Sequence, residues 1–318
     1  MSRLVISLVL LVTPTNASSE IVSVATKYGP LVGTLTGPAD AMVSVLLIGG
    51  SGPTDRDGNQ PGLVNDSLKL LAEGLNQHDV LTLRYDKRFA GASVPDGLRE
   101  IDLRFHILVE DAHHWLRFLS SRAPAAKQFV IGHSQGGLVA FLVAQTLDDL
   151  GGVVGMAAPG RPVDVLIESQ IALHAPKLSE EIRIALRQLR LGQPVEYSSA
   201  KLANLLRPSV QPFLRSWMMI DPANVVETIT TPTLLLYGGR DIQVRPQEGD
   251  YLVRANPAIR THTVPEMNHV LKRVDQSPES QRQAYTDPTL PLASELVRIL
   301  VDFISTSTKR THTQGATK

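Results

Sequence analysis

The sequence contains no cysteine, which excludes disulfide bonds, thiol nucleophiles and metal sites built from thiolates. Any nucleophile must therefore be an oxygen or nitrogen group. An excess of one charge is also lacking, because 31 Lys and Arg residues balance 31 Asp and Glu residues. This balance gives no sign of a nucleic-acid surface or an acidic tail, so we expect no nucleic-acid partner and none held by bulk electrostatics.

Long hydrophobic runs are lacking too, so we expect no stable membrane span. The apolar run over residues 4–12 is too short to cross a bilayer of about 30 Å as a helix. Arg3 precedes this run, and small residues follow it up to Ala17. A charge, an apolar stretch and a small-residue cleavage site together predict a secretory signal peptide over residues 1–17, and hence export to the periplasm or beyond.

The rest of the chain alternates short apolar runs with helical patterns. This alternation predicts an α/β fold in which crossover helices cover a mostly parallel, doubly wound sheet. The total of 318 residues is enough to bury a substantial core. The clearest strands are predicted over residues 43–49, 79–85, 129–134, 152–158 and 233–238.

Ser134 lies between Gly132 and Gly136, where an apolar strand pattern meets an apolar helical one. This Gly-x-Ser-x-Gly spacing predicts a serine nucleophile on a sharp strand-to-helix turn, where a Cβ at either glycine would meet the adjoining element. Gly137 gives further clearance at the helix start. His133, which directly precedes Ser134, is expected to pack behind the site.

A serine hydroxyl is a weak nucleophile at neutral pH, so it needs a base and an acid that orients the base. Asp241 follows an apolar strand and a Gly-Gly turn, and His269 follows another short strand. The carboxyl ends of parallel strands share one edge of a sheet, so Ser134, Asp241 and His269 are predicted to converge there. Their chain order, nucleophile, acid and histidine, is that of α/β-hydrolases.

Other residues compete for the roles of base and acid. His262 is predicted to lie inside the strand that precedes His269, which places it poorly for reaching a serine at the strand ends. Asp221 precedes a proline, and Asp250 lies in a helical stretch. We therefore favour His269 and Asp241.

The chain resembles an α/β-hydrolase over roughly residues 20–305. Residues 46–59 resemble the family's oxyanion loop, and residues 83–93 resemble its Tyr-Asp-x-Arg-Gly-x-Gly-x-Ser segment, with departures at Gly49 and Phe89. Within the superfamily, the chain resembles bacterial esterases related to serine aminopeptidase-like hydrolases. The resemblance implies ester hydrolysis through an acyl-enzyme with no cofactor.

The resemblance also implies an oxyanion hole made by the backbone N–H groups of Ser51 and Gln135. Aminopeptidase, thioesterase or acyltransferase activity would use the same catalytic groups. The alternative to an enzyme is a binding protein that keeps the hydrolase scaffold but has lost catalytic activity. We expect a small-molecule acyl substrate, while the sequence indicates no particular oligomeric state.

A helical block over residues 163–228 has no convincing strand and is predicted to be a cap inserted between two parts of the core, 18–162 and 229–305. Phe213, Trp217 and Met218 in this cap are candidates for lining an acyl pocket. The alternative is that they only pack the cap against the core. The polar residues 306–318 lack periodicity and are expected to be disordered.

The segment after the predicted strand at 43–49 has some features of a calcium loop. Asp55, Asp57, Asn59 and Asp66 occupy calcium-ligand positions, but Gln60 stands where the loop needs glycine. The flanking helices and the bidentate glutamate are missing as well. We therefore predict hydrogen bonds within the loop and no metal site.

Overall fold

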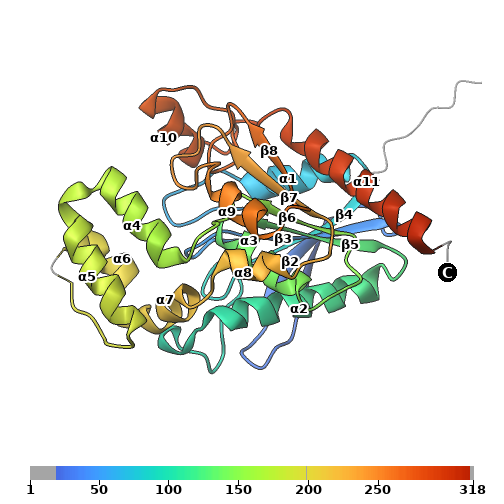
Figure 1. The fold of residues 1–318 in the computed structure, drawn as a ribbon. Helices are drawn as coiled ribbons and strands as arrows, with labels where there is room; N and C mark the ends of the chain where they lie inside the picture. Colours follow the sequence, from blue (N-terminus) through green and yellow to red (C-terminus); the bar gives the residue numbers. More distant parts are fainter. Residues whose placement is uncertain (1–18, 198, 316–318) are drawn as a thin grey trace, which may run out of the picture.

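The computed structural model describes residues 19–197 and 199–315, and Figure 1 shows their arrangement. The predicted signal peptide, residues 1–17, lies outside the described residues. None of the helices in the described part of the chain is both long and apolar enough to cross a membrane.

One sheet of eight strands, in the order β1-β2-β4-β3-β5-β6-β7-β8, forms the centre of the molecule. The pairs β1–β2 and β2–β4 are antiparallel, and every other pair is parallel, which confirms the predicted mostly parallel sheet. The strands are β1 (Ser19–Val24), β2 (Leu31–Thr36), β3 (Val43–Ile48), β4 (Val80–Tyr85), β5 (Lys127–His133), β6 (Gly152–Met156), β7 (Thr233–Gly238) and β8 (Arg260–Val264).

Helices cover both faces of the sheet, so the fold is doubly wound as predicted (Figure 1). Successive side chains of a strand point to opposite faces. Leu46 and Ile48 of β3 therefore pack into one core cluster, and Val45 and Leu47 into another. The first cluster includes residues of α2 (Phe105–Arg122), α3 (Gln135–Ala144), α8 (Pro222–Glu227) and α9 (Glu248–Ala255), and the second includes residues of α1 (Ser67–Asn76) and α11 (Leu296–Gly315).

The helical cap is inserted between β6 and β7 and extends to the left in Figure 1. It contains its own buried cluster, which includes Ile182, Leu186, Leu206 and Leu214. No strand occurs among the described residues of 163–228, in agreement with the sequence prediction. The cap helices are α4 (Val163–His174), α5 (Ser179–Arg190), α6 (Ala203–Leu206) and α7 (Gln211–Met218).

The predicted end of the cap at residue 228 needs correction, because α8 belongs to the core. Val225 and Val226 of α8 are buried in the cluster that covers the sheet, together with residues of α3 and α9. A buried apolar pair on this short helix joins it to the sheet layer, although in the sequence the helix follows the cap without a strand between them.

The prediction of a disordered tail from residue 306 is wrong for residues 306–315, which continue α11. Ser307 is 1% exposed on the same helix as the buried Ile304. The hydroxyls of Thr306 and Thr308 donate to the carbonyls of Asp302 and Ile304, one turn earlier. The threonine hydroxyls are hydrogen-bonded within the helix itself. A segment without an apolar pattern is therefore helical here.

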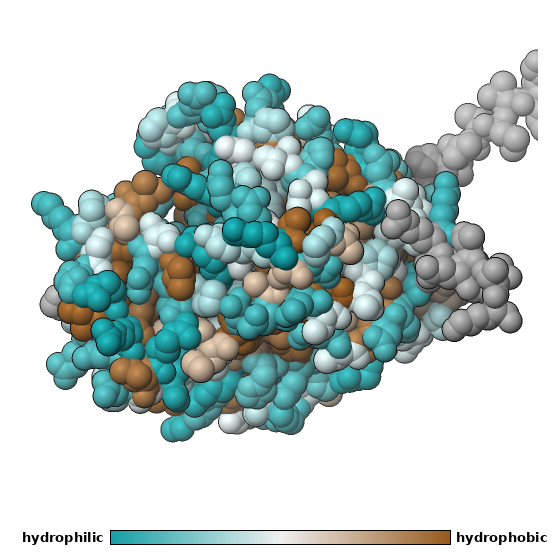
Figure 2. All heavy atoms as spheres, in the orientation of Figure 1, coloured by the Kyte–Doolittle hydropathy of each residue, from teal (hydrophilic) through white to brown (hydrophobic). Residues whose placement is uncertain are grey.

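The surface of the molecule is mixed in character. Figure 2 shows a face that is mostly hydrophilic with single apolar residues scattered over it, several of them on the cap at the left. Exposed apolar residues of the cap are Val165, Leu173, Ile184, Leu191 and Met219.

Candidate active site

Ser134 lies on the sharp turn between β5 and α3, as predicted. Its backbone has φ 53° and ψ −119°, a conformation that L-residues adopt only under constraint. The turn is tight, because a Cβ at Gly132 would lie 2.0 Å from the Gly136 carbonyl oxygen, and a Cβ at Gly136 would lie 2.4 Å from that of Ile48. The glycines therefore allow α3 to start directly beside β3 and β5.

Asp241 and His269 come together at the carboxyl ends of β7 and β8. The His269 Nδ1 atom lies 2.7 Å from the Asp241 Oδ2 atom, and both residues are 5% exposed. The other carboxylate oxygen, Oδ1, accepts from the backbone N–H groups of Gln243 at 2.7 Å and Val244 at 2.9 Å. The carboxylate is thus fixed from both sides, and it orients the imidazole so that Nε2 remains for proton transfer.

Ser134 itself is 8% exposed. Among the hydrogen bonds of the described residues, none joins its hydroxyl to His269. Catalytic hydrogen bonds are often long in the absence of substrate and tighten when it binds. The three predicted residues therefore lie at one edge of the sheet, with the acid and the base already bonded.

The competing residues have other places in the fold. Asp221 caps the N-terminus of α8, where its side chain accepts from the Ala223 N–H group. Asp250 is exposed on α9, and His262 is exposed on β8. Asp241 is the residue that meets His269, so the choice of acid and base partner made from the sequence agrees with the geometry.

His133 contacts His269 directly. Its Nε2 atom lies 2.7 Å from the His269 backbone oxygen, and the two rings are 4.8 Å apart. Burial lowers the pKa of His133 to about 3, so the ring is neutral at pH 7 and Nε2 donates its proton to that carbonyl. The sequence predicts packing behind the site, but its local pattern does not indicate that this ring connects β5 to the loop of His269.

The loop that carries His269 is held by a buried lysine. The Lys272 ammonium donates to the Leu290 carbonyl, and burial lowers the pKa of this lysine. The Lys272 backbone N–H donates to the Asn268 side chain at 3.0 Å. Leu271 has φ 65°, so the loop turns sharply at a residue that rarely adopts this conformation. These contacts fix the segment on both sides of His269.

The predicted oxyanion loop lies against Ser134. A Cβ built on Gly50 would be 3.3 Å from the Cβ of Ser134 and 3.2 Å from Nδ1 of His133. The Gly50–Ser51 peptide is therefore beside Ser134, and Gln135 follows Ser134 as the first residue of α3. Both amide groups proposed for the oxyanion hole belong to segments that border the serine.

Lys87 is buried beside this loop, although no local sequence motif points to a role for it. Its ammonium donates to the Gly50 carbonyl and lies 3.3 Å from Oε1 of Gln135. Burial lowers the pKa of Lys87 to about 7. The available signal was a run of three charged residues, 86–88, directly after the fully buried strand β4.

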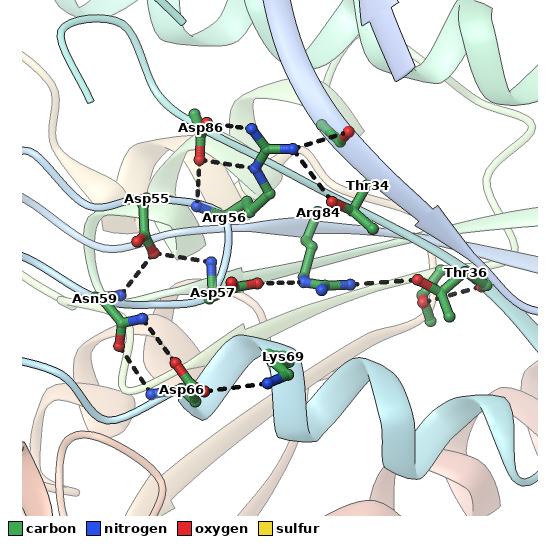
Figure 3. Close-up of polar contacts among 12 residues, drawn as sticks. Thr34, Thr36, Asp55, Arg56, Asp57, Asn59, Asp66, Lys69, Arg84 and Asp86 are labelled. Carbon is green, nitrogen blue, oxygen red and sulfur yellow. Dashed lines mark hydrogen bonds and ion pairs between the residues drawn. The ribbon is translucent and has the colours of Figure 1, made fainter. Parts of the chain in front are cut away.

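Two ion pairs attach the loop between β3 and α1 to the end of β4 (Figure 3). The Arg56 guanidinium lies 2.6 Å from the Asp86 carboxylate, which also accepts from the Arg56 backbone N–H at 2.7 Å. The Arg84 Nε atom lies 2.8 Å from the Asp57 carboxylate. Asp86 directly precedes Lys87, which donates to the Gly50 carbonyl. The end of β4 therefore holds the loop after β3 at two points, Gly50 and Arg56.

The residues that resembled a calcium loop bond to one another, as predicted. Asp55 accepts from the backbone N–H groups of Asp57 at 2.9 Å and Asn59 at 2.8 Å. Asn59 in turn donates to Asp66 at 2.7 Å (Figure 3). These contacts make a compact loop that leads from the oxyanion segment into α1.

The three cap residues proposed for the substrate pocket have different surroundings. Met218 is 1% exposed within the cap's own core, so the proposal that it lines a pocket is corrected. Phe213 and Trp217 are half-buried, and their rings lie 6.1 and 5.6 Å from that of Phe105 on α2. These contacts correspond to the alternative weighed from the sequence, in which the aromatic residues pack the cap against the core.

Comparison with known sequences shows the family of this chain. The profile of the family described as "Serine aminopeptidase, S33" matches residues 65–277, which is well over half of the chain. The chain belongs to this family. The matched region includes Ser134, Asp241 and His269, whereas Ser51 precedes it.

A curated relative is Esterase EstD of Thermotoga maritima, which is 26% identical to this chain over 241 residues. The match covers 72% of this chain and 54% of EstD, so the chain spans about half the length of that relative.

Similarity to solved structures shows that this chain has the α/β-hydrolase fold. The Pyrococcus furiosus esterase Pf2001 superposes with a TM-score of 0.60 and 18% identity, over 94% of this chain and 95% of the esterase. The α/β hydrolase GrgF of Penicillium sp. sh18 gives a TM-score of 0.60 and 18% identity, over 91% and 99% of the two chains. Est1E of Butyrivibrio proteoclasticus gives a TM-score of 0.58 and 15% identity, over 90% of this chain and 99% of Est1E.

Proposed function

We propose that the protein is a serine hydrolase that cleaves carboxylic esters through an acyl-enzyme. The observation that carries this proposal is the buried 2.7 Å hydrogen bond between His269 and Asp241, at the sheet edge where Ser134 occupies a strained turn. A positioned imidazole and a serine held in such a turn are the two requirements for an activated serine nucleophile. The names of EstD and of the esterases with similar folds support the ester as the substrate class.

In the proposed reaction, the Ser134 oxygen forms a bond to the ester carbonyl carbon while His269 Nε2 accepts the hydroxyl proton. The carbonyl oxygen becomes an oxyanion, which the N–H groups of Ser51 and Gln135 stabilise. Collapse of this intermediate breaks the ester bond, and His269 gives the proton to the leaving alcohol. Water activated by His269 then releases the acid. Side chains, backbone amides and water supply every step, so the proposal requires no cofactor.

The nucleophile is tested by labelling the protein with a fluorophosphonate probe. We expect the wild type to be modified at Ser134 and the Ser134→Ala variant to be unmodified. Turnover of a short-chain ester should fall by roughly six orders of magnitude in this variant if the three residues act as a unit. His262→Gln is the matched control, because His262 is exposed on β8 and its loss should leave the rate unchanged. Equal labelling of wild type and Ser134→Ala would reject the assignment.

A second candidate function, hydrolysis of aminoacyl amides, is suggested by the description of the matched family. The same triad would perform it, because a leaving amine takes the proton from His269 just as an alcohol does. A comparison of kcat/KM for acyl esters of graded chain length and for aminoacyl amides separates the two. We expect the esters to be cleaved faster, and faster cleavage of the amides would replace the proposed substrate class.

We also propose that the protein is exported by way of residues 1–17. The support is the order of Arg3, the apolar run and the small residues near Ala17. Expression of the full chain followed by N-terminal sequencing tests this proposal. A mature protein that begins near residue 18 is expected, and one that retains residues 1–17 inside the cell would contradict it.

A further inference from the structure

Lys87 lies just after the end of β4 and is 7% exposed. Its ammonium bonds to Gly50 on one side and lies within reach of the Gln135 side chain on the other. These two residues belong to separate segments, the loop after β3 and the start of α3. Lys87 therefore joins the two pieces of backbone that border the nucleophile.

The Gly50 carbonyl belongs to the same peptide group as the Ser51 N–H. In a planar trans peptide, C=O and N–H point in opposite directions. An ammonium that holds the carbonyl thus determines where the N–H points. A hydrogen bond to the carbonyl also polarises the peptide, which strengthens the N–H as a donor.

We propose that Lys87 is a positioning residue for the oxyanion hole, which holds the Gly50 carbonyl and the Gln135 side chain so that the N–H groups of Ser51 and Gln135 point at one oxygen atom. This inference rests on the proposed function. Lys87 acts through the two backbone segments and contacts neither the substrate nor the reacting atoms.

Stability alone is a poor reason for a lysine at this place. Burial lowers the pKa of Lys87 to about 7, which means that the folded protein bears a cost for its charge. Methionine matches lysine in length and carries no charge, and a neutral acceptor left unpaired costs less than an unpaired buried charge. We therefore expect Lys87→Met to fold, and any loss of rate in it to report on the lost donor.

The test compares Lys87→Met with wild type and with Lys27→Met. Lys27 pairs with Glu110 and its side chain is 61% exposed, so its variant controls for the loss of a lysine as such. We expect kcat for a short-chain ester to fall about 100-fold in Lys87→Met, with KM within about threefold of wild type, because the loss is confined to the transition state. Lys27→Met should match wild type in both constants.

Binding of an aryl trifluoromethyl ketone gives a readout that a purely structural role would not change. This probe forms a tetrahedral adduct with an active serine and places an oxyanion in the hole. Its affinity should fall in Lys87→Met by about the factor lost in kcat/KM, while the affinity for the product acid stays as in wild type. An unchanged kcat in folded Lys87→Met, or equal loss of affinity for ketone and acid, would overturn the proposal.

Chemical rescue keeps the test decisive if Lys87→Met does not fold. The wild-type chain has no cysteine, so Lys87→Cys can be alkylated with 2-bromoethylamine at this one thiol under denaturing conditions and then refolded. The product carries an ammonium at the length of lysine. We expect alkylation to restore kcat at least tenfold relative to the variant alkylated with iodoacetamide, a gain that represents one recovered donor. Equal rates after the two treatments would reject the proposal.

Failure of the proposed function can be distinguished from failure of this inference. A wild-type protein that reacts with fluorophosphonate but cleaves no ester disproves the substrate class, and the labelling rates of wild type and Lys87→Met still test the lysine. An active wild type with an equally active Lys87→Met variant disproves the role of Lys87 and leaves the proposed function intact.

Discussion

His133 stays neutral in the folded protein because its ring is buried against His269, which lowers its pKa to about 3. In the unfolded chain a histidine has a pKa near 6.5. The unfolded state therefore binds one more proton than the folded state between these two values. The stability that this residue contributes is complete above about pH 6.5 and falls as the pH drops toward 3.

We predict that the free energy of unfolding falls by about 2 to 3 kcal/mol through His133 alone between pH 7.5 and pH 4.5. In His133→Gln this loss disappears, since glutamine can donate to the His269 carbonyl but does not titrate in this range. Urea unfolding at the two pH values measures the difference.

The control for this experiment is His262→Gln, because His262 is exposed. Its loss of stability between the two pH values should equal that of the wild type. A decline in His133→Gln as steep as in wild type would show that protonation of His133 does not drive the acid sensitivity.

At the residue scale, the sequence was sufficient to identify Asp241 and His269 as partners, because each follows a strand and strand ends share an edge. It could not reveal Lys87 or the contact of His133 with His269. Those contacts depend on which strands are neighbours in the sheet, and on the side to which each side chain points at the strand end. Neither fact is encoded in local spacing.

At the scale of elements, the turn from β5 into α3 depends on close contact between backbones. We predict that Gly136→Ala lowers the free energy of unfolding by about 3 kcal/mol or more. The added methyl group would lie 2.4 Å from the Ile48 carbonyl oxygen and 2.7 Å from that of Gly49. Relief requires movement of β3 or α3, so ester turnover should be lost as well.

Gly49→Ala is the matched control, since a methyl group there would lie 3.4 Å from the Thr54 side chain, an ordinary contact. Its stability should remain within about 1 kcal/mol of wild type. Urea unfolding and ester turnover test both variants. Comparable losses in Gly49→Ala and Gly136→Ala would contradict a specific steric role for the second glycine of the motif.

The sequence predicted the five central strands because each is a short apolar run that is buried on both faces. The edge strand β1 and its neighbour β2 were not singled out. β1 in particular has three exposed residues in succession, so its apolar signal is weak. The position of α8 was assigned wrongly for another reason. A short helix has the same local pattern whether it packs on a cap or on a sheet.

At the scale of the whole molecule, the cap is docked on α2 through aromatic side chains and a hydrogen bond. The Phe105 ring is 1% exposed and faces Phe213 and Trp217. The Phe105 backbone N–H donates to the Ser216 hydroxyl at 2.9 Å. A cap residue thus satisfies one of the free N–H groups at the start of a core helix.

We predict that Phe105→Ala costs about 3 to 5 kcal/mol of stability, the range for a buried aromatic ring. We also expect faster proteolysis within the cap, because α7 loses its aromatic partner on the core. Urea unfolding measures the first effect, and limited proteolysis with mapping of the cleaved peptides measures the second.

Phe118→Ala serves as the control, since Phe118 also lies on α2 but contacts Trp115. Cleavage of its cap should be as slow as in wild type. The proposed docking would be contradicted if the two variants released the same cap peptides at the same rate.

The insertion of the cap between β6 and β7 has a consequence for engineering. The proposed nucleophile, acid, base and oxyanion donors all come from outside α4 to α7, as does Lys87. The inserted segment can therefore be exchanged between homologues as one cassette, with its junctions near Arg161 and Asp221. Such chimeras would keep the reaction chemistry of the host, because none of the proposed catalytic groups is exchanged.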